Sequence, residues 1–447
     1  MRVYLIYLAT FLLSVYAWKD WFSAAAGLVL MIAVHDNPDT PRELLGVSGL
    51  NLWNLLLLAT VPAWLVGRRR EGLTWDLPPT ARLLFAIYVG IIGIGFLRLF
   101  LDPGPVDFGT AELVGEYLVN PLKYLLPAVM IYDGARSRPR LVLALACVLG
   151  VCVFLSVLVV RWVPLSDAMS GGDLGHAALR RLDRETGFFR TGLSVMLAGA
   201  SWGVLAARGL VESRLLKVAL LGVAGFLVLA MGLTGGRGGY LAWVCIGLVM
   251  GMVRWRAALI LAPIGVALIL AAVPGVRERA LEGLLGTEER GGEGGVDTAR
   301  LSAGRLGVWP YMLAKVGEAP FVGFGRLGYQ RSGLHAQLSA EVDASFPHPH
   351  NAYLEWLLDN GGLGMLPMVL VYGLVLGCSL VLFTDSRHPI FVAAGGVAFA
   401  FVFAQLVGGM TGRYWYPNEE TVTMWAAVGL MARVWVERSR GGSAAAS

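Results

Sequence analysis

Charged residues are scarce in this chain of 447 residues. Asp, Glu, Lys and Arg together make up 15% of it, whereas they account for about a quarter of an average soluble protein. Hydrophobic residues make up 56% of the chain, and apolar stretches long enough to cross a hydrocarbon layer of about 30 Å recur along nearly all of it. The composition therefore argues against a water-soluble fold. It predicts an all-α polytopic integral membrane protein with about 12 (12–14) transmembrane helices.

Several chemical frameworks are also missing. The four cysteines all lie inside apolar runs, so no disulfide or zinc framework is readable. No Asp-x-Asp pair, His-x-x-x-His pair or glycine-rich nucleotide loop occurs, which argues against a nucleotide-sugar or metal-dependent transferase. No internal repeat is visible, which disfavours a secondary transporter. The net charge of +5 fits the orientation signals of a membrane protein and does not indicate a nucleic-acid partner.

The apolar segments predict where the helices lie. Several of them are short enough to be half-helices or re-entrant segments. The first segment follows Arg2 without a small-residue cleavage site, so it is expected to be a retained helix rather than a removed signal. The last residues, 441–447, read GGSAAAS and resemble a cloning scar. The predicted spans are residues 3–17, 21–34, 51–67, 81–101, 117–133, 141–163, 191–208, 217–233, 240–253, 257–274, 351–383, 390–410 and 421–435.

Short loops rich in arginine and lysine define the predicted orientation. Such loops stay in the cytoplasm, and here six of them fall on alternate connections between predicted helices. The other connections are then extracytoplasmic. The longest, residues 275–350, is predicted to form a large external loop domain between transmembrane helices in 1–274 and those in 351–440. The basic loops contain Arg68, Arg69 and Arg70; Arg136, Arg138 and Arg140; Arg214 and Lys217; Arg254 and Arg256; Arg387; and Arg433, Arg438 and Arg440.

The long external loop has two parts of different character. Residues 286–295 read GTEERGGEGG and are expected to be mobile, because they contain almost no apolar side chain that could be buried. Residues 302–316 have a helical pattern.

The junction between this loop and the next helix carries the most chemical information. It places His350 and Asn351 in the first turn of the helix, at the membrane surface. Imidazole, with an ordinary pKa near 6.5, is well matched to taking a proton from a hydroxyl group at neutral pH, so His350 is the candidate base. The alternative is that His350 only caps the helix together with Asn351. His348 is a weaker candidate, because Pro349 makes it hard for both rings to face one target.

This junction resembles the signature of a known family. His350 and Asn351, nine intervening residues, and then Gly361-x-x-Gly364 are similar to the signature of the O-antigen ligase superfamily. That superfamily also contains O-antigen and exopolysaccharide polymerases and some protein O-oligosaccharyltransferases. Residues 234–243, 302–309 and 320–329 resemble further stretches of the same family in order and spacing. One departure is that Gly236 precedes Arg237, where family members often have a serine.

The resemblance implies a fold, a donor and a location. It implies a metal-independent glycosyltransferase with a C-type, all-helical membrane fold and no cofactor. The donor would be a glycan linked to undecaprenyl pyrophosphate, presented at the periplasmic face of the bacterial inner membrane. Gly361 and Gly364 are expected to allow close helix packing rather than to touch substrate.

A pyrophosphate donor would need cationic side chains for its leaving group. Guanidinium pairs with phosphate oxygens through two hydrogen bonds and stays protonated, which makes Arg190, Arg237 and Arg305 the candidates. Each has a structural alternative: Arg190 as an interface anchor, Arg305 as a partner of Asp297 or Glu318. Arg237 is harder to explain in that way, because it stands alone among four glycines.

Further polar residues at the outer helix ends are weaker candidates. Arg413 is a possible additional substrate contact, as are Asn351 and His348. The aromatic residues that follow Arg413, at 414–416, are expected to form an interfacial belt. Arg98 is expected to extend its charged group to the membrane surface.

The predicted reaction is a direct displacement. His350 accepts the proton of an acceptor hydroxyl, the oxygen attacks the anomeric carbon, and undecaprenyl pyrophosphate leaves with inversion. The acceptor is lipid A core in a ligase, a second lipid-linked glycan in a polymerase, or a protein hydroxyl, and the motifs resemble the ligase signature most closely. A transporter of an anionic solute is the alternative from another class. It would place the arginines near the membrane midplane rather than at the outer face.

Overall fold

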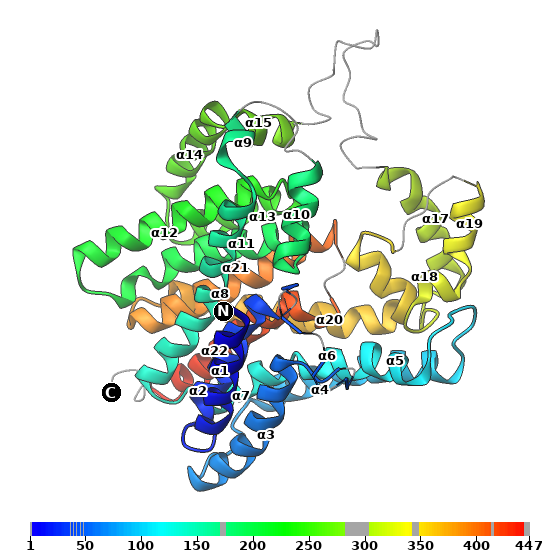
Figure 1. Cartoon of the computed structure of the whole chain (residues 1–447), viewed down its shortest axis with the longest axis horizontal. Helices are drawn as coiled ribbons and strands as arrows, with labels where there is room; N and C mark the ends of the chain where they lie inside the picture. The colour runs from blue at the N-terminus through cyan, green and yellow to red at the C-terminus, as the bar shows by residue number, and fades with distance from the viewer. Residues whose placement is uncertain are drawn as a thin grey trace.

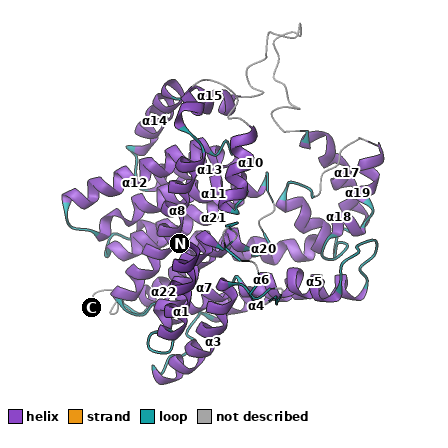
Figure 2. Cartoon of the chain, viewed as in Figure 1, coloured by secondary structure: helices purple, strands orange, loops and turns teal. Residues whose placement is uncertain are grey.

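The computed structural model describes residues 2–441, apart from residues 36, 39, 42, 45, 48, 170–175, 282–303, 342–347, 413 and 414. Within these residues the chain is all-helical, as predicted. Figure 2 shows only helices and loops, and the single β geometry is an isolated bridge between Leu44 and Val47. The Gly/Glu-rich stretch at 286–295 and the terminal residues 442–447 lie outside the described residues.

Almost every predicted span corresponds to a helix. The apolar runs fold this way because a helix satisfies all of its backbone hydrogen bonds internally, which hydrocarbon surroundings require. These helices are α1 (Arg2–Tyr16), α2 (Trp21–Met31), α3 (Leu52–Arg70), α4 (Pro79–Leu101), α8 (Arg138–Trp162), α11 (Arg190–Ala207), α12 (Arg214–Leu233), α13 (Arg237–Val253), α14 (Ala258–Ala272), α20 (Ala352–Thr384), α21 (Pro389–Gly409) and α22 (Val422–Ser439).

Six helices in the described part are long and apolar enough to cross a membrane, or seven if α14 and the sharply bent α15 (Pro274–Leu281) form one span. Three shorter apolar helices accompany them, at residues 4–16, 21–34 and 237–253. The chain is therefore a multi-pass helical protein. The count of about 12 crossings remains a prediction.

The predicted span at 117–133 is interrupted in the structure. It is divided into α5 (Thr110–Val114), a π-helical turn η2 (Gly115–Val119), α6 (Asn120–Lys123) and α7 (Leu126–Gly134). Pro121 and Pro127 each lie in the first turn of a new helix. Proline lacks the N–H that would continue the preceding helix, so the two prolines explain the breaks.

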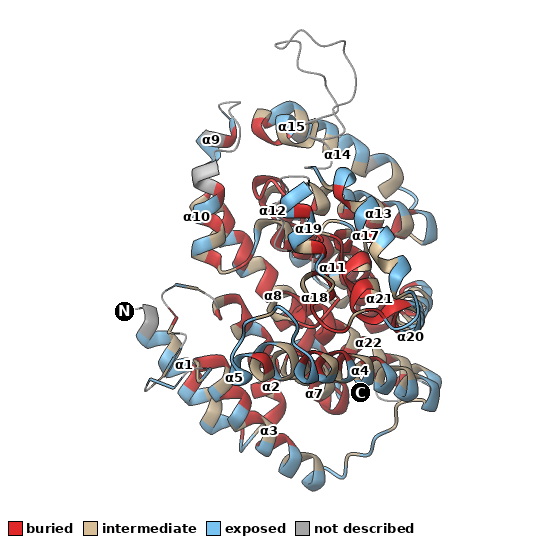
Figure 3. Ribbon diagram, turned by 90° about the vertical axis from the view of Figure 1, so that its right-hand side faces the viewer, coloured by how far each residue is buried: buried red, intermediate tan, exposed pale blue. Residues whose placement is uncertain are grey.

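Helix α11 lies at the centre of the bundle. Nearly all of it from Gly192 to Ala206 is buried, and it packs against α12, α13 and α21. Figure 3 shows the buried residues concentrated along these inner helices, with more exposed residues on the outer ones. The absence of a side chain at Gly199 permits the close approach to α21, because a Cβ there would lie 3.1 Å from the Cα of Phe401.

Short helices of the long loop pack on the start of α20. α17 (Arg305–Glu318), α18 (Gly328–Arg331) and α19 (Leu334–Glu341) lie together beside α20, away from α12 and α14 (Figure 1). The predicted helix at 302–316 is thus α17. A small apolar core, distinct from that of the bundle, joins these helices to α20 and contains Val308, Met312, Tyr329, Leu334, Leu338, Leu354 and Leu358.

Helix α20 is interrupted at Gly361, where the backbone is left-handed with φ of 61°. The loop from Pro320 to Gly325 fills the interruption and provides partners for the backbone groups that the break releases. A Cβ at Gly361 would lie 2.4 Å from the Phe321 carbonyl, so this glycine permits close packing, although against the loop rather than against another helix. The hydrogen bonds run from Phe324 N to Leu358 O (2.6 Å), Gly325 N to Asp359 O (2.8 Å), Gly362 N to Pro320 O (2.8 Å) and Leu363 N to Phe321 O (3.0 Å).

Arg98 holds the same loop in place. Its guanidinium donates to the carbonyl oxygens of Val322 (2.5 Å) and Gly323 (2.8 Å). Arg98 therefore binds backbone carbonyls of the loop, and its extension to the membrane surface stays a prediction.

The predicted basic loops come together at one end of the molecule. Asp76 binds Arg433 and lies 3.4 Å from Arg136, while Asp133 accepts from Arg68 at 2.9 Å. Arg438 binds Asp385 at the far end of α20, and Arg254 donates to Ser386 in the same turn. These contacts support the prediction that the basic loops share one side of the protein.

Candidate active site

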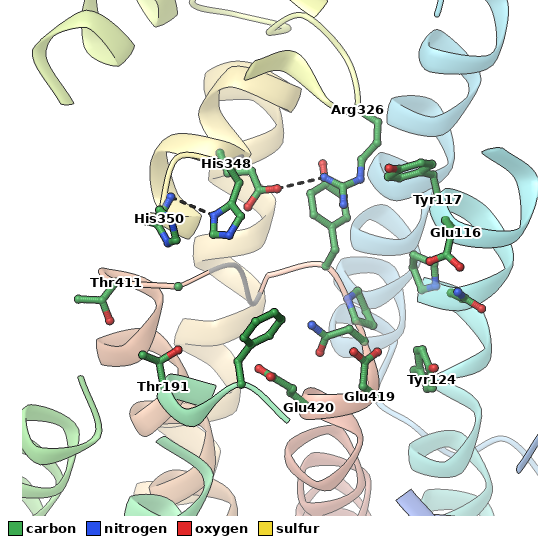
Figure 4. Close-up of a pocket in the computed structure, with 18 of the residues that line it drawn as sticks. Glu116, Tyr117, Tyr124, Thr191, Arg326, His348, His350, Thr411, Glu419 and Glu420 are labelled. Atoms are coloured by element: carbon green, nitrogen blue, oxygen red, sulfur yellow. Dashed lines mark hydrogen bonds and ion pairs between the residues drawn. The ribbon is translucent and has the colours of Figure 1, made fainter. Parts of the chain in front are cut away.

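A cavity of about 760 Å³ lies at the opposite ends of these helices. It is bounded by the first turns of α11, α17 and α20, by the η2–α6 segment and by the loop before α22 (Figure 4). Four of the residues singled out in the sequence line it: Arg190, Arg305, His348 and His350. They come from segments far apart in the chain, so the fold assembles the cavity from residues that the sequence separates.

The two histidines lie against each other. Their ring centroids are 3.9 Å apart, and the backbone N–H of His350 donates to Nδ1 of His348 at 3.3 Å. The expectation that Pro349 keeps the two rings from facing one target is wrong, because His350 adopts a left-handed backbone with φ of 50° that turns its ring back toward His348. Such a conformation costs on the order of 1–3 kcal/mol outside glycine, and strained residues of this kind cluster at functional sites.

Asn351 has a structural role. Its side chain caps α20 by accepting from the backbone N–H groups of Tyr353 (3.0 Å) and Leu354 (3.2 Å). A cap of this kind stabilises a helix by about 1 kcal/mol. Asn351 is not among the residues that line the cavity, whereas His350 is. The capping alternative therefore applies to Asn351, and the histidine ring remains directed to the cavity.

Arg190 is the first residue of α11, and two carboxylates surround its turn. Its backbone N–H donates to Asp183 at 2.7 Å. Glu420 packs against Gly192, where a Cβ would lie 2.1 Å from the carboxylate. Burial raises the pKa of Asp183, and the backbone hydrogen bond and the charge of Arg190 partly offset this. Among the described residues, no carboxylate forms an ion pair with the Arg190 guanidinium, and Arg190 lines the cavity.

Arg237 begins α13 beside this turn but does not line the cavity. The glycine before it packs on α11: Ser194 donates to the Gly236 carbonyl at 2.8 Å, and a Cβ at Gly236 would lie 2.5 Å from that of Ser194. This close contact explains why a glycine occupies position 236. Nε of Arg279 donates to the Gly235 carbonyl at 3.2 Å, so a second arginine lies beside the turn that precedes Arg237.

Arg305 begins α17 and faces the cavity. Helix α17 starts directly after Gly304, whose left-handed φ of 77° turns the chain into it. Of its two suggested partners, Glu318 binds Lys315 at 2.8 Å and Asp297 lies outside the described residues. Arg413 lies outside them as well.

Trp415 and Tyr416, before α22, are buried in the protein and do not form part of a membrane-interface belt, and Tyr414 lies outside the described residues. Trp415 and Tyr416 are 2% and 8% exposed, and Tyr416 lines the cavity. They pack on Tyr353 and Trp356 of α20, with ring centroids 4.0 Å and 4.8 Å apart. The expectation for these two residues is therefore wrong, because α20 offers an apolar surface that buries them.

Several cavity residues were missed in the sequence. Arg326 is the most important of them, since it is buried and ion-paired to Glu355 and Asp359. Glu419 and Glu420 also line the cavity (Figure 4). The stretch at 320–329 had been recognised as family-like, but nothing in it distinguished Arg326 from a surface arginine.

Comparison with known families bears directly on this region. The family model described as O-Antigen ligase matches residues 222–369. This match confirms the predicted resemblance to the O-antigen ligase superfamily. The matched segment contains Arg237, Arg305, Arg326, His348 and His350, while Arg190 precedes it. A search of curated proteins finds no match.

Proposed function

We propose that the protein is a glycosyltransferase that moves a glycan from undecaprenyl pyrophosphate to an acceptor hydroxyl. The observation that carries this proposal is the meeting of an imidazole, His350, with the guanidinium groups of Arg190 and Arg305 in one cavity. A transferase of this type needs a base for the acceptor and cations for the departing diphosphate. The family match supports the same class of membrane enzyme.

In the proposed reaction, His350 takes the proton of the acceptor hydroxyl as the oxygen attacks the anomeric carbon. The bond from that carbon to the diphosphate breaks, its electrons remain on the phosphate oxygen, and the new glycosidic bond has inverted configuration. His348 accepts from the His350 backbone, so it fixes the position of the base. No cofactor or metal ion is included in this mechanism.

Arg190 and Arg305 bind the diphosphate in this proposal, and Arg237 acts beside them. Fixed cations at a developing negative charge act most strongly where water is excluded, and the loss of one donor can slow catalysis about a hundredfold or more. Arg190 and Arg237 are the first residues of α11 and α13, two helices that pack on each other, which favours this part of the site for the diphosphate.

The cavity is assigned to the periplasmic face of the bacterial inner membrane. The basic loops meet at the other end of the helices, and such loops remain in the cytoplasm. The grouping of the arginines at one helix end favours an enzyme over a transporter of an anionic solute, which would place them near the midplane. The preferred acceptor is lipid A core, as in an O-antigen ligase. The alternatives are a second lipid-linked glycan, as in a polymerase, and a protein hydroxyl.

The test is a transfer assay with purified protein, an undecaprenyl-pyrophosphate glycan and either lipid A core or only the donor itself. Product size names the acceptor: one addition to lipid A core indicates a ligase, and a ladder of donor multiples indicates a polymerase. The proposal expects undiminished transfer in EDTA. Absence of transfer to lipid A core, donor or a protein acceptor would reject it.

A further inference from the structure

Arg326 is held in an unusual setting for a cation in this cavity. Its side chain is 8% exposed, and its Nη1 binds Asp359 at 2.9 Å and lies 3.4 Å from Glu355. The guanidinium carbon lies 3.6 Å from the ring centroid of Tyr416 and 5.3 Å from that of Tyr117. Burial opposes its charge, yet the surrounding oxygens raise the pKa of Arg326, so it stays protonated.

One edge of this guanidinium has no protein partner. Both ion pairs use Nη1, while the buried Nε has no hydrogen-bond acceptor. A buried donor without a partner costs about 1–3 kcal/mol, which a ligand group at the right place would recover. Because Arg326 lines the cavity, a substrate oxygen is the natural acceptor for Nε.

The two carboxylates beside Arg326 have different roles. Asp359 is fully engaged, since it also accepts from the Tyr416 hydroxyl at 2.8 Å and the Gly328 backbone at 2.7 Å. Glu355 is the carboxylate of this group that lines the cavity. The cavity thus presents a hydrogen-bond donor and an acceptor next to each other, framed by the rings of Tyr416 and Tyr117.

The acidic partner of Arg326 distinguishes it from Arg190. Arg326 is ion-paired to Glu355, which also lines the cavity, whereas no carboxylate of the described residues is ion-paired to Arg190. The carboxylate of a uronic acid placed beside Arg326 would therefore face the Glu355 carboxylate. A sugar hydroxyl suits the Arg326 group, because it can accept from Nε and donate to the Glu355 carboxylate.

We propose that Arg326 and Glu355, held by Asp359 and Tyr416, form a subsite for an uncharged sugar ring of the glycan substrate. This proposal rests on the proposed function and adds a substrate class to it: neutral sugars are favoured at this position over uronic acids. The ring belongs to the donor or to the acceptor, and separate KM values for donor and acceptor distinguish the two.

The test compares Glu355→Gln with the parental enzyme. The KM for donor and for acceptor is measured separately, with a neutral glycan and with a matched glycan that carries one uronic acid. Losing the charged acceptor is expected to raise one of the two KM values for the neutral glycan about tenfold or more. It is also expected to narrow the preference for the neutral glycan over the uronic-acid glycan, because the Glu355 charge that would face the uronic-acid carboxylate is removed. Glu112→Gln on α5 is the matched control, since Glu112 is exposed and does not line the cavity.

Arg326→Lys gives a second arm. This substitution keeps the charge but removes the Nε donor and the planar stacking on Tyr416. It is therefore expected to raise the KM that Glu355→Gln raises. Arg180→Lys, at an exposed position, is the control. If Arg326→Lys does not fold, Glu355→Gln decides alone. An unchanged KM and unchanged preference in folded Glu355→Gln would overturn the subsite.

A binding measurement keeps this result separate from the failure of the proposed function. The neutral and uronic-acid oligosaccharides, without a lipid carrier, are titrated against the parental protein and Glu355→Gln with tryptophan fluorescence as readout. Trp356 stacks on Tyr416 and reports on the subsite. If the parental protein binds the neutral oligosaccharide more tightly than the uronic-acid oligosaccharide, and Glu355→Gln weakens this preference, the subsite is supported even when no transfer is observed. Equal binding of both oligosaccharides to both proteins contradicts it.

Discussion

Arg433 at the basic end of the helical bundle and Arg190 at the cavity end are placed in opposite ways. At the end with the basic loops, Arg433 binds Asp76 with its side chain 1% exposed, and Arg68 binds a fully buried Asp133. At the cavity end, Arg190 has no ion pair among the described residues, although carboxylates lie close to its helix turn. The paired, buried Arg433 holds helices together, whereas Arg190 faces the cavity, where it could bind a substrate.

This difference predicts which substitutions affect stability and which affect catalysis. At the basic end, removing Arg433 takes the most buried cation from the Asp76 carboxylate. At the cavity end, removing the Arg190 guanidinium breaks no ion pair among the described residues and should leave the fold intact. Four substitutions break or sharpen this contrast.

Arg433→Gln is expected to have the largest effect. Arg433 also donates from Nε to the Tyr132 carbonyl at 3.0 Å, so its loss removes the most buried cation from Asp76 and the donor from this carbonyl, although the Tyr132 hydroxyl still donates to Asp76. Breaking a buried ion pair typically costs about 3–5 kcal/mol, and the thermal transition in detergent should fall by many degrees. Arg440→Gln removes a 57% exposed partner of the same Asp76 and should cost under about 1 kcal/mol. If Arg433→Gln and Arg440→Gln lower the thermal transition equally, the buried ion pair of Arg433 with Asp76 does not hold the helices together.

Arg190→Gln is expected to slow glycan transfer about a hundredfold or more while the thermal transition stays near its parental value. The reason is that the guanidinium is placed for the diphosphate and has no ion pair to lose. Transfer is measured under single-turnover conditions with saturating acceptor. A parental rate, or a loss of rate that only follows a loss of fold, would show that Arg190 is an interface anchor.

Gly192→Ala tests the packing that positions Arg190. Its new methyl group would meet the Glu420 carboxylate at 2.1 Å, which must move. Overpacking of this kind costs about 1–3 kcal/mol, and the transfer rate should fall with it because Arg190 lies two residues earlier. Gly222→Ala, at a position with open space around it on α12, is the matched control and should be neutral or slightly stabilising. Identical melting of the two variants would argue against the close contact.

Asp183→Asn should have the smallest effect, on the pH dependence of stability. Burial raises the pKa of Asp183 above its ordinary value of 3.8, so its protonated form is favoured in the folded protein. Its contribution is then present below pH 3.8 and is lost as the pH rises through the folded pKa. Asparagine keeps an acceptor for the Arg190 backbone and cannot ionise. The variant should therefore lose less stability than the parent as the pH rises from 3.8 to neutral, in thermal unfolding curves recorded across that range.

Hydropathy and loop charge were sufficient for most of the fold. Continuous apolar runs identify helices because a membrane leaves the backbone no other hydrogen-bond partners. The break in the 117–133 segment had a signal in Pro121 and Pro127, but its apolar composition concealed it. The interruption of α20 at Gly361 depends on a loop forty residues earlier, and hydropathy carries no information about such a partner.

The cavity was predictable only in part. His350, Arg190 and Arg305 stood out because their residue types suit the chemistry and because they follow helix starts. The sequence did not indicate Arg326, because its position in the cavity depends on ion pairs with Glu355 and Asp359, which lie 29 and 33 residues further along the chain. Pro349 predicts that the rings of His348 and His350 cannot easily face one target. The structure differs because His350 has a left-handed backbone, which has no signature in the sequence.

The most direct test of the central claim is the transfer rate of purified His350→Ala. The protein should fold and bind the lipid-linked donor with parental affinity, while single-turnover transfer to the acceptor falls by at least about a hundredfold. His388→Ala, which changes a histidine at the start of α21 away from the cavity, should transfer normally. Transfer by His350→Ala at the parental rate would contradict the account, because no imidazole at this position would then be needed to activate the acceptor.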